Sequence, residues 1–229
     1  MTTITVDAIL FDMDGTLIDS TPGVLQAWAI FSKDYNLGDP AEIAHSAHGR
    51  RLYDTLKELC KLDDEVKLQA EIVRFEEAVI NGGPFALPGA LDLIQQLITG
   101  APIGKFGWTI VTSATNVYTP SALAKCLVPL PSAGYITSND VSNGKPHPDP
   151  YLAGAKKCGV DATNCLVIED AIAGLKAGKN AGSKTLAVCT STPREVISAS
   201  DANPDFIVED LTRVSAKWVG QKIELTIAA

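Results

Sequence analysis

The sequence predicts an α/β fold in which a helical insert interrupts a core built on a parallel sheet. From residue 89 onward, short apolar runs alternate with helical patterns, which is typical of parallel strands joined by helices. Before that region, a single apolar run at 7–11 is followed by helical patterns, with no convincing strand between residues 18 and 83. The core therefore begins with one strand and resumes only after the insert.

The first part of the chain is expected to hold one strand and three helices. The run DAILF at 7–11 is short and apolar, as a buried strand requires. Apolar residues then recur at helical spacing, with Pro22 placed for a first helical turn. The expected helices are 22–35, 51–60 and 63–80. The stretch NGGPFALPGA, rich in Gly and Pro, is interpreted as the linker that returns the chain to the core.

The rest of the chain is expected to complete a Rossmann-like sheet covered by helices. Apolar runs predict strands at 108–112, 134–137, 165–168, 184–188 and 205–208, the last as the final core strand. Helices are expected at 91–98, 121–127, 151–158, 171–180 and 193–199, the third with Asp149 as N-cap and Pro150 at its first position. The predicted domains are a core of 1–17 with 89–229 and an all-helical insert of 18–88.

Composition restricts the classes of partner. The chain has 229 residues and a net charge of −8, which argues against nucleic acid and anionic membrane surfaces. A small anionic substrate in a locally positive pocket remains compatible with this charge. Five cysteines without CxxC spacing indicate reduced thiols rather than disulfides or zinc ligands. The N-terminal segment has no signal-peptide pattern, and no apolar run spans a membrane. We expect a cytoplasmic protein that is a monomer or weak dimer.

Polar side chains follow three expected strands. Ligands of such sheets bind beyond the carboxyl ends of the strands, so these side chains are candidates for one site. They are Asp12 and Asp14, Thr112 and Ser113, and Glu169 and Asp170, and Lys145 lies on a polar loop before the third pair.

Each group alone also has an ordinary structural interpretation. DMDGT is not a calcium loop of the EF-hand type, because Gly15 is fourth rather than sixth and a strand precedes it, but its aspartates suit a capped turn. A threonine that ends a strand is commonplace, and Pro146 favours an extended Lys145 on the surface. Asp170 suits the N-cap of the next helix, whereas Glu169 is harder to explain as a cap.

In this order, however, the four groups resemble the motifs of the haloacid dehalogenase-like phosphohydrolases. The resemblance covers nearly the whole chain, because the helical insert matches the cap domain of such enzymes. The stretches HGRR, TSAT, NGKPHPDPY and EDLTRVS are similar to the fungal glycerol phosphate phosphatases and 2-deoxyglucose-6-phosphate phosphatases. VIEDAIAGLKAG lacks the proline often found after the acidic pair, a departure expected to affect packing more than chemistry.

The resemblance implies a magnesium site. A carboxylate nucleophile about 4 Å from a phosphate charge meets a repulsion of roughly 4 kcal/mol at an effective dielectric constant near 20. Mg²⁺ prefers oxygen ligands and offsets such charge. Its implied ligands are a side-chain oxygen of Asp12, the backbone carbonyl of Asp14 and the side chain of Asp170. Glu169 would bind through water or orient the other ligands.

The resemblance also implies the catalytic roles. Asp12 is the expected nucleophile, which forms an aspartyl-phosphate, and Asp14 is the expected acid and base. Residues i and i+2 of an extended segment share a face, so both carboxylates can face one phosphate. Gly15 would allow the tight turn that follows. Lys145 and Thr112 complete the expected catalytic set by supplying a positive charge and a hydroxyl to the phosphate.

Phosphate and substrate contacts are expected from several further residues. Backbone N–H groups around Met13 and Ser113 and the side chain of Asn116 are the expected phosphate donors. The insert would close over the site and exclude water. Its loop matches a Gly-x-Arg pattern that reaches substrate in the resembling family, through Gly49 and Arg51. A solvated helix start is the alternative interpretation for this arginine, and His48 is a further candidate contact.

The function predicted from the sequence is that of a Mg²⁺-dependent phosphoric monoester hydrolase. Its substrate would be a small phosphorylated metabolite, namely a polyol or sugar phosphate of the glycerol phosphate or hexose 6-phosphate type. The nearest alternative is a β-phosphoglucomutase-like phosphotransferase with the same motifs. A catalytically silent binding protein on this scaffold is the third alternative, although such a protein would be expected to lose a motif aspartate.

Overall fold

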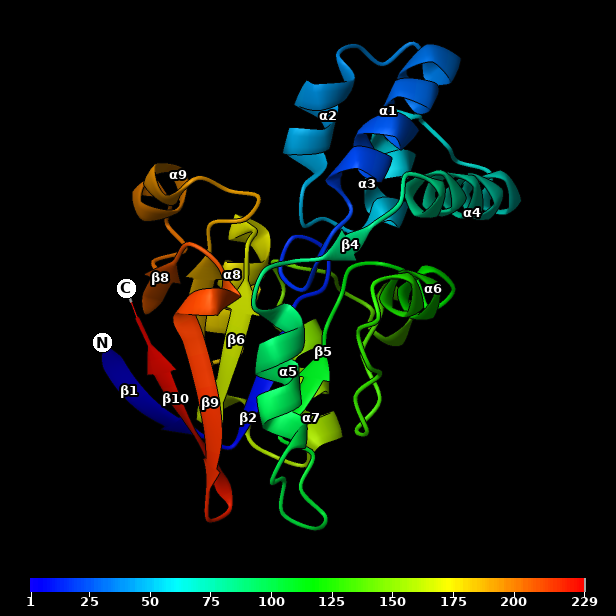
Figure 1. Cartoon of the computed structure of the whole chain (residues 1–229). Coiled ribbons are helices and arrows are strands. Elements are labelled where there is room, and N and C mark those ends of the chain that lie inside the picture. The colour runs from blue at the N-terminus through cyan, green and yellow to red at the C-terminus, as the bar shows by residue number, and fades with distance from the viewer. Residues whose placement is uncertain (229) are drawn as a thin grey trace.

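The computed structural model describes residues 1–228 and has the expected α/β architecture (Figure 1). Five parallel strands form the central sheet in the order β5-β2-β6-β7-β8. The strands are β5 Trp108–Ile110, β2 Ala8–Phe11, β6 Cys165–Glu169, β7 Lys184–Val188 and β8 Phe206–Val208. All five coincide with apolar runs identified in the sequence, so the predicted core sheet is confirmed.

The central strands are apolar along their whole length because both faces of the sheet are covered. Every residue of β2 and β6 is buried. Ile9 and Phe11 belong to one hydrophobic cluster, whereas Ala8 and Leu10 belong to a second cluster on the other side, as the alternation of side chains along a strand requires. Burial of each large apolar side chain stabilises the fold by about 1.5–3 kcal/mol.

Helices connect the strands and cover the sheet. α7 packs against β2 and β5, and α8 packs against β6 and β7. The core helices are α5 Ala90–Ile98, α6 Tyr118–Lys125, α7 Asp149–Cys158, α8 Ile172–Asn180 and α9 Arg194–Ala199. Single 3-10 turns occur at Ser138–Asp140, Ala162–Asn164 and Leu211–Arg213. The residue before α7 is Pro148, and no side chain caps this helix, so the expectation that Asp149 is its N-cap is wrong.

The insert consists of four helices that lie above the carboxyl end of the sheet (Figure 1). They are α1 Thr21–Tyr35, α2 Pro40–Ala47, α3 Leu52–Leu59 and α4 Glu65–Asn81. Trp28, Phe31 and Phe75 form its aromatic centre, with the rings of Trp28 and Phe75 4.9 Å apart. The sequence did not indicate α2, which begins where the Asp39 side chain accepts hydrogen bonds from two backbone N–H groups.

Two short strands mark where the chain leaves and re-enters the core. β3 Ile18–Asp19 pairs antiparallel with β4 Phe85–Ala86. β3 was not predicted from the sequence, because two residues carry no detectable periodicity. This pairing holds both connections of the helical insert side by side, close to the end of β2.

A second sheet lies outside the predicted core. β1 Thr2–Val6, β10 Lys222–Ile227 and β9 Val214–Val219 form an antiparallel sheet in the order β1-β10-β9. The chain therefore continues beyond the strand expected to be last. In contrast, the strand expected at 134–137 is reduced to one bridge between Ile136 and Val111.

Two expectations drawn from composition can be compared with the structure. All five cysteines, which lie within the described residues, are free thiols, and Cys189 alone among them is not buried. Across residues 1–228, each helix is too short or too polar to cross a membrane.

Candidate active site

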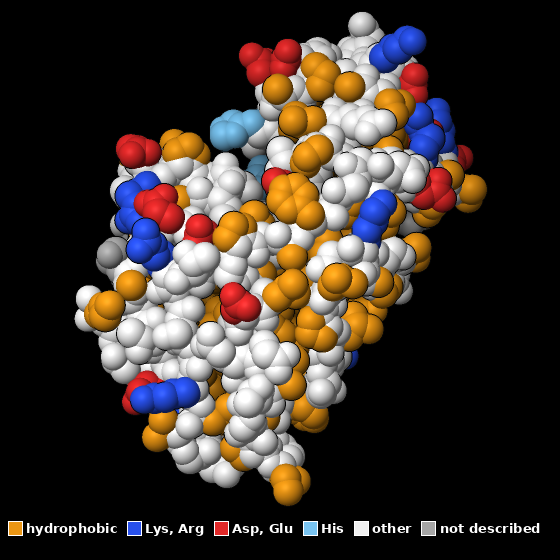
Figure 2. All heavy atoms as spheres, in the orientation of Figure 1, with side chains coloured by type: hydrophobic (Ala, Val, Ile, Leu, Met, Phe, Trp, Pro, Cys, Tyr) orange, Lys and Arg blue, Asp and Glu red, His pale blue; other side chains and the backbone are white. Residues whose placement is uncertain are grey.

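The candidate residues of three separate motifs meet at one edge of the sheet. Asp12 follows the last residue of β2, Thr112 follows β5, and Glu169 ends β6. Because these strands are parallel neighbours, their carboxyl ends lie together. A cavity of about 410 Å³ separates this edge from the helical insert. Figure 2 shows it as a hollow bordered by pale-blue histidine atoms.

The turn after β2 is built around a glycine. Met13 is buried, and its carbonyl accepts hydrogen bonds from the N–H groups of Leu17 and Ile18 at 2.9 and 3.0 Å. Gly15 has a φ of +89°, and a Cβ atom there would lie 2.1 Å from Oδ2 of Asp170. Only glycine combines this conformation with so close an approach. The turn thereby packs its backbone directly against the side chain of Asp170.

Lys145 joins Asp12, at the end of β2, to Glu169, at the end of β6. Its Nζ donates to Oδ1 of Asp12 at 2.5 Å and to Oε1 of Glu169 at 2.7 Å. The Tyr151 hydroxyl also donates to Oε1 of Glu169, at 3.0 Å. Lys145 is thus buried against two carboxylates, and the interpretation of an exposed surface lysine is wrong.

Glu169 also organises the backbone before α8. Its Oε2 accepts the N–H groups of Asp170 and Ala171 at 3.0 and 2.9 Å. Gly174 faces this carboxylate, and a Cβ atom there would lie 1.6 Å from Oε1. The alternative in which Asp170 caps the helix is therefore wrong, because the residue before α8 is Ala171 and no side chain caps this helix.

The buried charges of this cluster do not balance. Burial raises the pKa of Asp12 well above its ordinary value, and the charges of Glu169 and Asp170 add to this effect while Lys145 opposes it. Burial disfavours the Lys145 ammonium, but Asp12 and Glu169 raise its pKa above the ordinary value. The Lys145 ammonium and, beside Asp170, the His48 ring thus face three buried carboxyl groups, with Asp14 as a fourth acid nearby. A further positive charge would relieve their repulsion.

The donor atoms fit a hard divalent cation. Oxygen atoms of Asp12, Glu169 and Asp170 all lie within 4.8 Å of one another, and all three residues are buried. Carboxylates in this arrangement are typical ligands of Mg²⁺ and Ca²⁺. The structure therefore supports a metal site at this cluster, which contains Asp12 and Asp170 from the expected ligand set together with Glu169.

Asp14 is held by hydroxyl groups. The Tyr118 hydroxyl, from α6, donates to Oδ1 of Asp14 at 2.9 Å, and the Ser20 side chain is a second partner. Burial raises the pKa of Asp14, whereas these two bonds lower it. A raised pKa favours the protonated form that a general acid needs. Reasoning from the sequence missed Tyr118, because nothing in α6 indicates that its hydroxyl reaches a residue 104 positions away.

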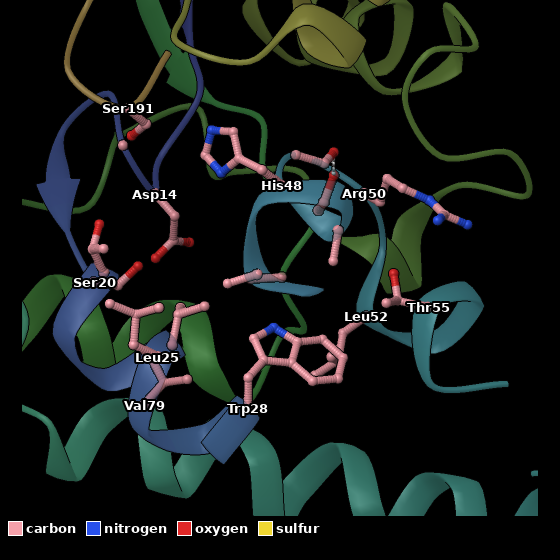
Figure 3. A pocket seen from close by; sticks show the side chains of 18 of the residues that line it. Asp14, Ser20, Leu25, Trp28, His48, Arg50, Leu52, Thr55, Val79 and Ser191 are labelled. Carbon is pink, nitrogen blue, oxygen red and sulfur yellow. Dashed lines mark hydrogen bonds between the residues drawn. The ribbon is translucent and has the colours of Figure 1, made fainter. Parts of the chain in front are cut away.

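Asp170 has one hydrogen-bond partner in the turn after β2 and one in the helical insert. The Thr16 hydroxyl donates to its Oδ1 at 3.0 Å, and Nε2 of His48 lies 2.7 Å from its Oδ2. Burial alone would lower the pKa of His48, but the hydrogen bond and charge of Asp170 raise it to about 9. This hydrogen bond links the insert to Asp170, and Figure 3 shows His48 at the end of the cavity where Asp14 and Ser191 lie.

Two of the expected phosphate contacts line the cavity. Thr112 and Ser113 both do so. The Thr112 hydroxyl accepts the N–H of Ala114 at 3.1 Å, and the Ser113 hydroxyl donates to the Gly49 carbonyl at 3.2 Å. Asn116 is exposed and does not line the cavity, and its backbone N–H donates to Asn139 at 3.0 Å.

The two residues of the Gly-x-Arg pattern in the insert lie in different places relative to the cavity. Gly49 lines the cavity with a φ of +73°. Arg51 does not line it, because its guanidinium pairs with Asp54 at 2.8 and 3.1 Å and reaches the carbonyl of Ser142 at 3.3 Å. Arg50 lines the cavity but pairs with Glu58 at 2.5 Å.

The insert also supplies an apolar wall and one carboxylate that the sequence analysis did not single out. Figure 3 shows the wall, which consists of Leu25, Trp28, Leu52 and Val79, opposite Asp14 and Ser191. The carboxylate is Glu76 of α4, which is buried in the same cavity. Its position on the apolar face of an amphipathic helix was the available signal, since neighbours such as Phe75 are buried.

A comparison with known families agrees with this site. Residues 6–182 match the family described as haloacid dehalogenase-like hydrolase, and the chain belongs to that family. It is 37% identical to hexitol phosphatase A of Escherichia coli over 81% of this chain and 85% of that protein. It is 34% identical to glycerol-1-phosphate phosphohydrolase 1 of Saccharomyces cerevisiae over 81% and 76% of the two chains. It is 31% identical to 2-deoxyglucose-6-phosphate phosphatase 1 of the same yeast over 94% and 92%.

Solved structures share the architecture. A putative β-phosphoglucomutase from Bacteroides vulgatus matches with a TM-score of 0.75 and 28% identity, covering 91% of this chain and 85% of that one. A hydrolase from Pseudomonas syringae matches with a TM-score of 0.75 and 25% identity over 89% and 93%. The family and these relatives confirm the predicted enzyme class, phosphoric monoester hydrolase.

Proposed function

We propose that this protein is a Mg²⁺-dependent phosphatase that hydrolyses the phosphate monoester of a small polyol or sugar. The observation that carries the proposal is the meeting of Asp12, Asp14 and Lys145 with the buried acidic pair at the cavity. The names of the relatives, which include a hexitol phosphatase and a glycerol-1-phosphate phosphohydrolase, support this substrate class. Retention of every motif carboxylate disfavours a silent binding protein.

Asp12 acts as the nucleophile in the proposed reaction, and Asp14 acts as the acid and base. A carboxylate oxygen of Asp12 attacks phosphorus, and the bond between phosphorus and the leaving oxygen breaks. Protonated Asp14 gives its proton to that oxygen, which departs as the alcohol. Asp14 then takes a proton from water as the water attacks phosphorus in the aspartyl-phosphate. Inorganic phosphate leaves, and both side chains return to their starting states.

The surrounding residues orient the nucleophile and offset the negative charge of the phosphate and the carboxylates. Lys145 holds Asp12 in place and supplies positive charge next to the attacked phosphate. Asp12, the Asp14 carbonyl and Asp170 would hold Mg²⁺, with Glu169 orienting Lys145 or binding through water. When bound, Mg²⁺ supplies the charge that offsets the buried carboxylates and the phosphate. Backbone N–H groups near Met13 and Ser113 and the Thr112 hydroxyl would donate to phosphate oxygens.

The helical insert forms the half of the cavity that faces the leaving group. Trp28 and Leu25 offer apolar surface to the carbon skeleton of a sugar or polyol. Gly49 would bring the insert backbone close to the substrate. Arg51 and Asn116 lie outside this cavity, so a contact from either to substrate would require movement of its side chain.

The proposal is tested by assaying inorganic phosphate released from a panel of polyol and sugar phosphates, with Mg²⁺ and with EDTA. We expect release that requires Mg²⁺, and Asp12→Asn should abolish it while circular dichroism shows a folded protein. Turnover retained in Asp12→Asn would refute the assignment of the nucleophile. Analysis of the sugar product distinguishes hydrolysis, which yields the free alcohol, from transfer of phosphate within the sugar.

A further inference from the structure

Glu76 is a buried carboxyl group to which the proposed mechanism gives no role. It lies on α4 with only 7% of its surface exposed, and it lines the cavity that Asp12 and Asp14 also line. Phe75 and Val79 flank it in the same wall. Burial of an ionisable group is costly unless it is compensated, so its position in an apolar wall calls for a physical account.

The core holds this carboxylate in place across the boundary with the insert. The Thr115 backbone N–H donates to Oε1 of Glu76 at 3.1 Å, and the Thr115 hydroxyl donates to Oε2 at 2.6 Å. Thr115 belongs to the loop that leads from β5 to α6. Each carboxylate oxygen can accept a further hydrogen bond. Glu76 therefore presents fixed acceptors to the cavity, and its ionised form has no donor.

No free cation balances Glu76 among the described residues that line this cavity. His48 pairs with Asp170 at the phosphate end, and His45 is exposed to solvent. Arg50 pairs with Glu58, and Figure 3 shows its side chain extending away from the space between Asp14 and Trp28. The leaving-group half of the cavity therefore combines an acidic group with apolar walls.

We propose that Glu76 is a specificity-determining residue that admits phosphate monoesters with an uncharged leaving group and rejects those with a second anionic group. This inference rests on the proposed phosphatase function. A hydroxyl of a polyol or sugar can donate to Glu76, whereas a carboxylate or second phosphate meets a like charge beside apolar walls. Such an acidic ligand also finds no cation there to pair with.

Matched substrates test the inference. Glycerol 3-phosphate and 3-phosphoglycerate share a three-carbon skeleton and differ at the terminal carbon as alcohol and carboxylate. Glucitol 6-phosphate and 6-phosphogluconate form the corresponding six-carbon pair. We would measure kcat/KM at about pH 8, which lies above the pKa of about 7 that burial gives Glu76. The pair used is the one whose neutral member the wild type hydrolyses faster.

Two variants of adjacent residues separate the local effect of Glu76 from that of net charge. Glu76→Gln keeps the size of the side chain and removes its charge. Glu77→Gln makes the same change at the next position of α4, which is exposed and lies outside the cavity. We expect the wild type and Glu77→Gln to prefer the neutral ester at least about tenfold in kcat/KM, or about 1.4 kcal/mol. Glu76→Gln should reduce this preference to less than about threefold, through a lower KM for the acidic ester.

The outcomes separate this inference from the proposed function. Equal hydrolysis of both esters by the wild type, or an unchanged preference in Glu76→Gln, would overturn the role of Glu76 alone. Failure to hydrolyse any neutral ester would overturn the phosphatase proposal and this inference with it. If Glu76→Gln does not fold, inhibition of the wild type decides the question. We expect the acidic ester to inhibit with a constant at least about tenfold above the KM of its neutral partner, and equal constants would refute the inference.

Discussion

Replacing Glu76 by glutamine should stabilise the protein relative to wild type as the pH rises from about 5 to about 8. Burial raises the pKa of Glu76 from an ordinary 4.5 to about 7, and the charge of Asp14 adds to this effect, whereas two hydrogen bonds from Thr115 oppose it. A carboxyl group whose pKa is higher in the folded state contributes stability at low pH. That contribution is lost as the pH rises through the folded pKa, because the unfolded chain releases its proton first.

The size of the stability difference follows from the shift in the pKa of Glu76. Each pKa unit corresponds to about 1.4 kcal/mol, so the shift from 4.5 to about 7 corresponds to about 3 kcal/mol. For a chain of this length, this is roughly 6–12 °C in melting temperature. Glutamine does not titrate, and at about pH 5 the protonated Glu76 resembles it. The difference between the two proteins should therefore be small at pH 5 and grow until about pH 8.

Thermal unfolding followed by circular dichroism, in EDTA and at several pH values, measures this difference. The charge of Asp14 raises the pKa of Glu76, and EDTA prevents a cation bound near Asp14 from altering this effect. Glu77→Gln, which alters an exposed neighbour, should follow the wild-type curve. A difference between Glu76→Gln and wild type that stays flat with pH, or that shrinks as the pH rises, would refute the reasoning.

Three further changes test the candidate active site. Lys145→Met should abolish phosphate release and lower the free energy of unfolding by about 3–5 kcal/mol in urea titrations, because Asp12 and Glu169 lose their buried partner; unchanged stability would contradict the ion-pair network. Tyr118→Phe should lower kcat for an alkyl phosphate about tenfold with little change in KM, since Asp14 loses the hydroxyl that orients it; an unaltered kcat would exclude this positioning role. Gly15→Ala should weaken Mg²⁺ binding in calorimetric titrations, because its Cβ would collide with Asp170; wild-type affinity would show that the turn tolerates a side chain.

The sequence predicts the central sheet well because its signals are local. Each buried strand is a short apolar run, and the carboxylates that follow two of these runs meet because parallel strands end at one edge. The second sheet also had a local signal, since buried and exposed residues alternate along much of β9 and β10 around Gly220. The pairing of β10 with β1 had no local signal, because this pairing joins the two ends of the chain.

The sequence offered His48 as a candidate contact, but it did not predict the bonds that His48 and Tyr118 make, because these bonds join distant elements. His48 lies 122 positions from Asp170, and Tyr118 lies 104 from Asp14. A contact between residues so far apart in the chain leaves no pattern in a single sequence. Arg51 matched a motif, yet its partner Asp54 is three residues away and holds its guanidinium outside the cavity. The domain boundaries at 18–88 and the roles of the individual residues remain predictions.

The central claim is that Asp12 carries the phosphoryl group during turnover. The most direct measurement is to mix enzyme, Mg²⁺ and the best polyol phosphate, quench in acid within the first turnover, and analyse peptides by mass spectrometry. The account predicts the added mass of one phosphoryl group on the peptide that contains Asp12, and its loss when the quenched peptide is treated with hydroxylamine. Full phosphate release with no phosphoryl group on that peptide at any time of quenching would contradict the account.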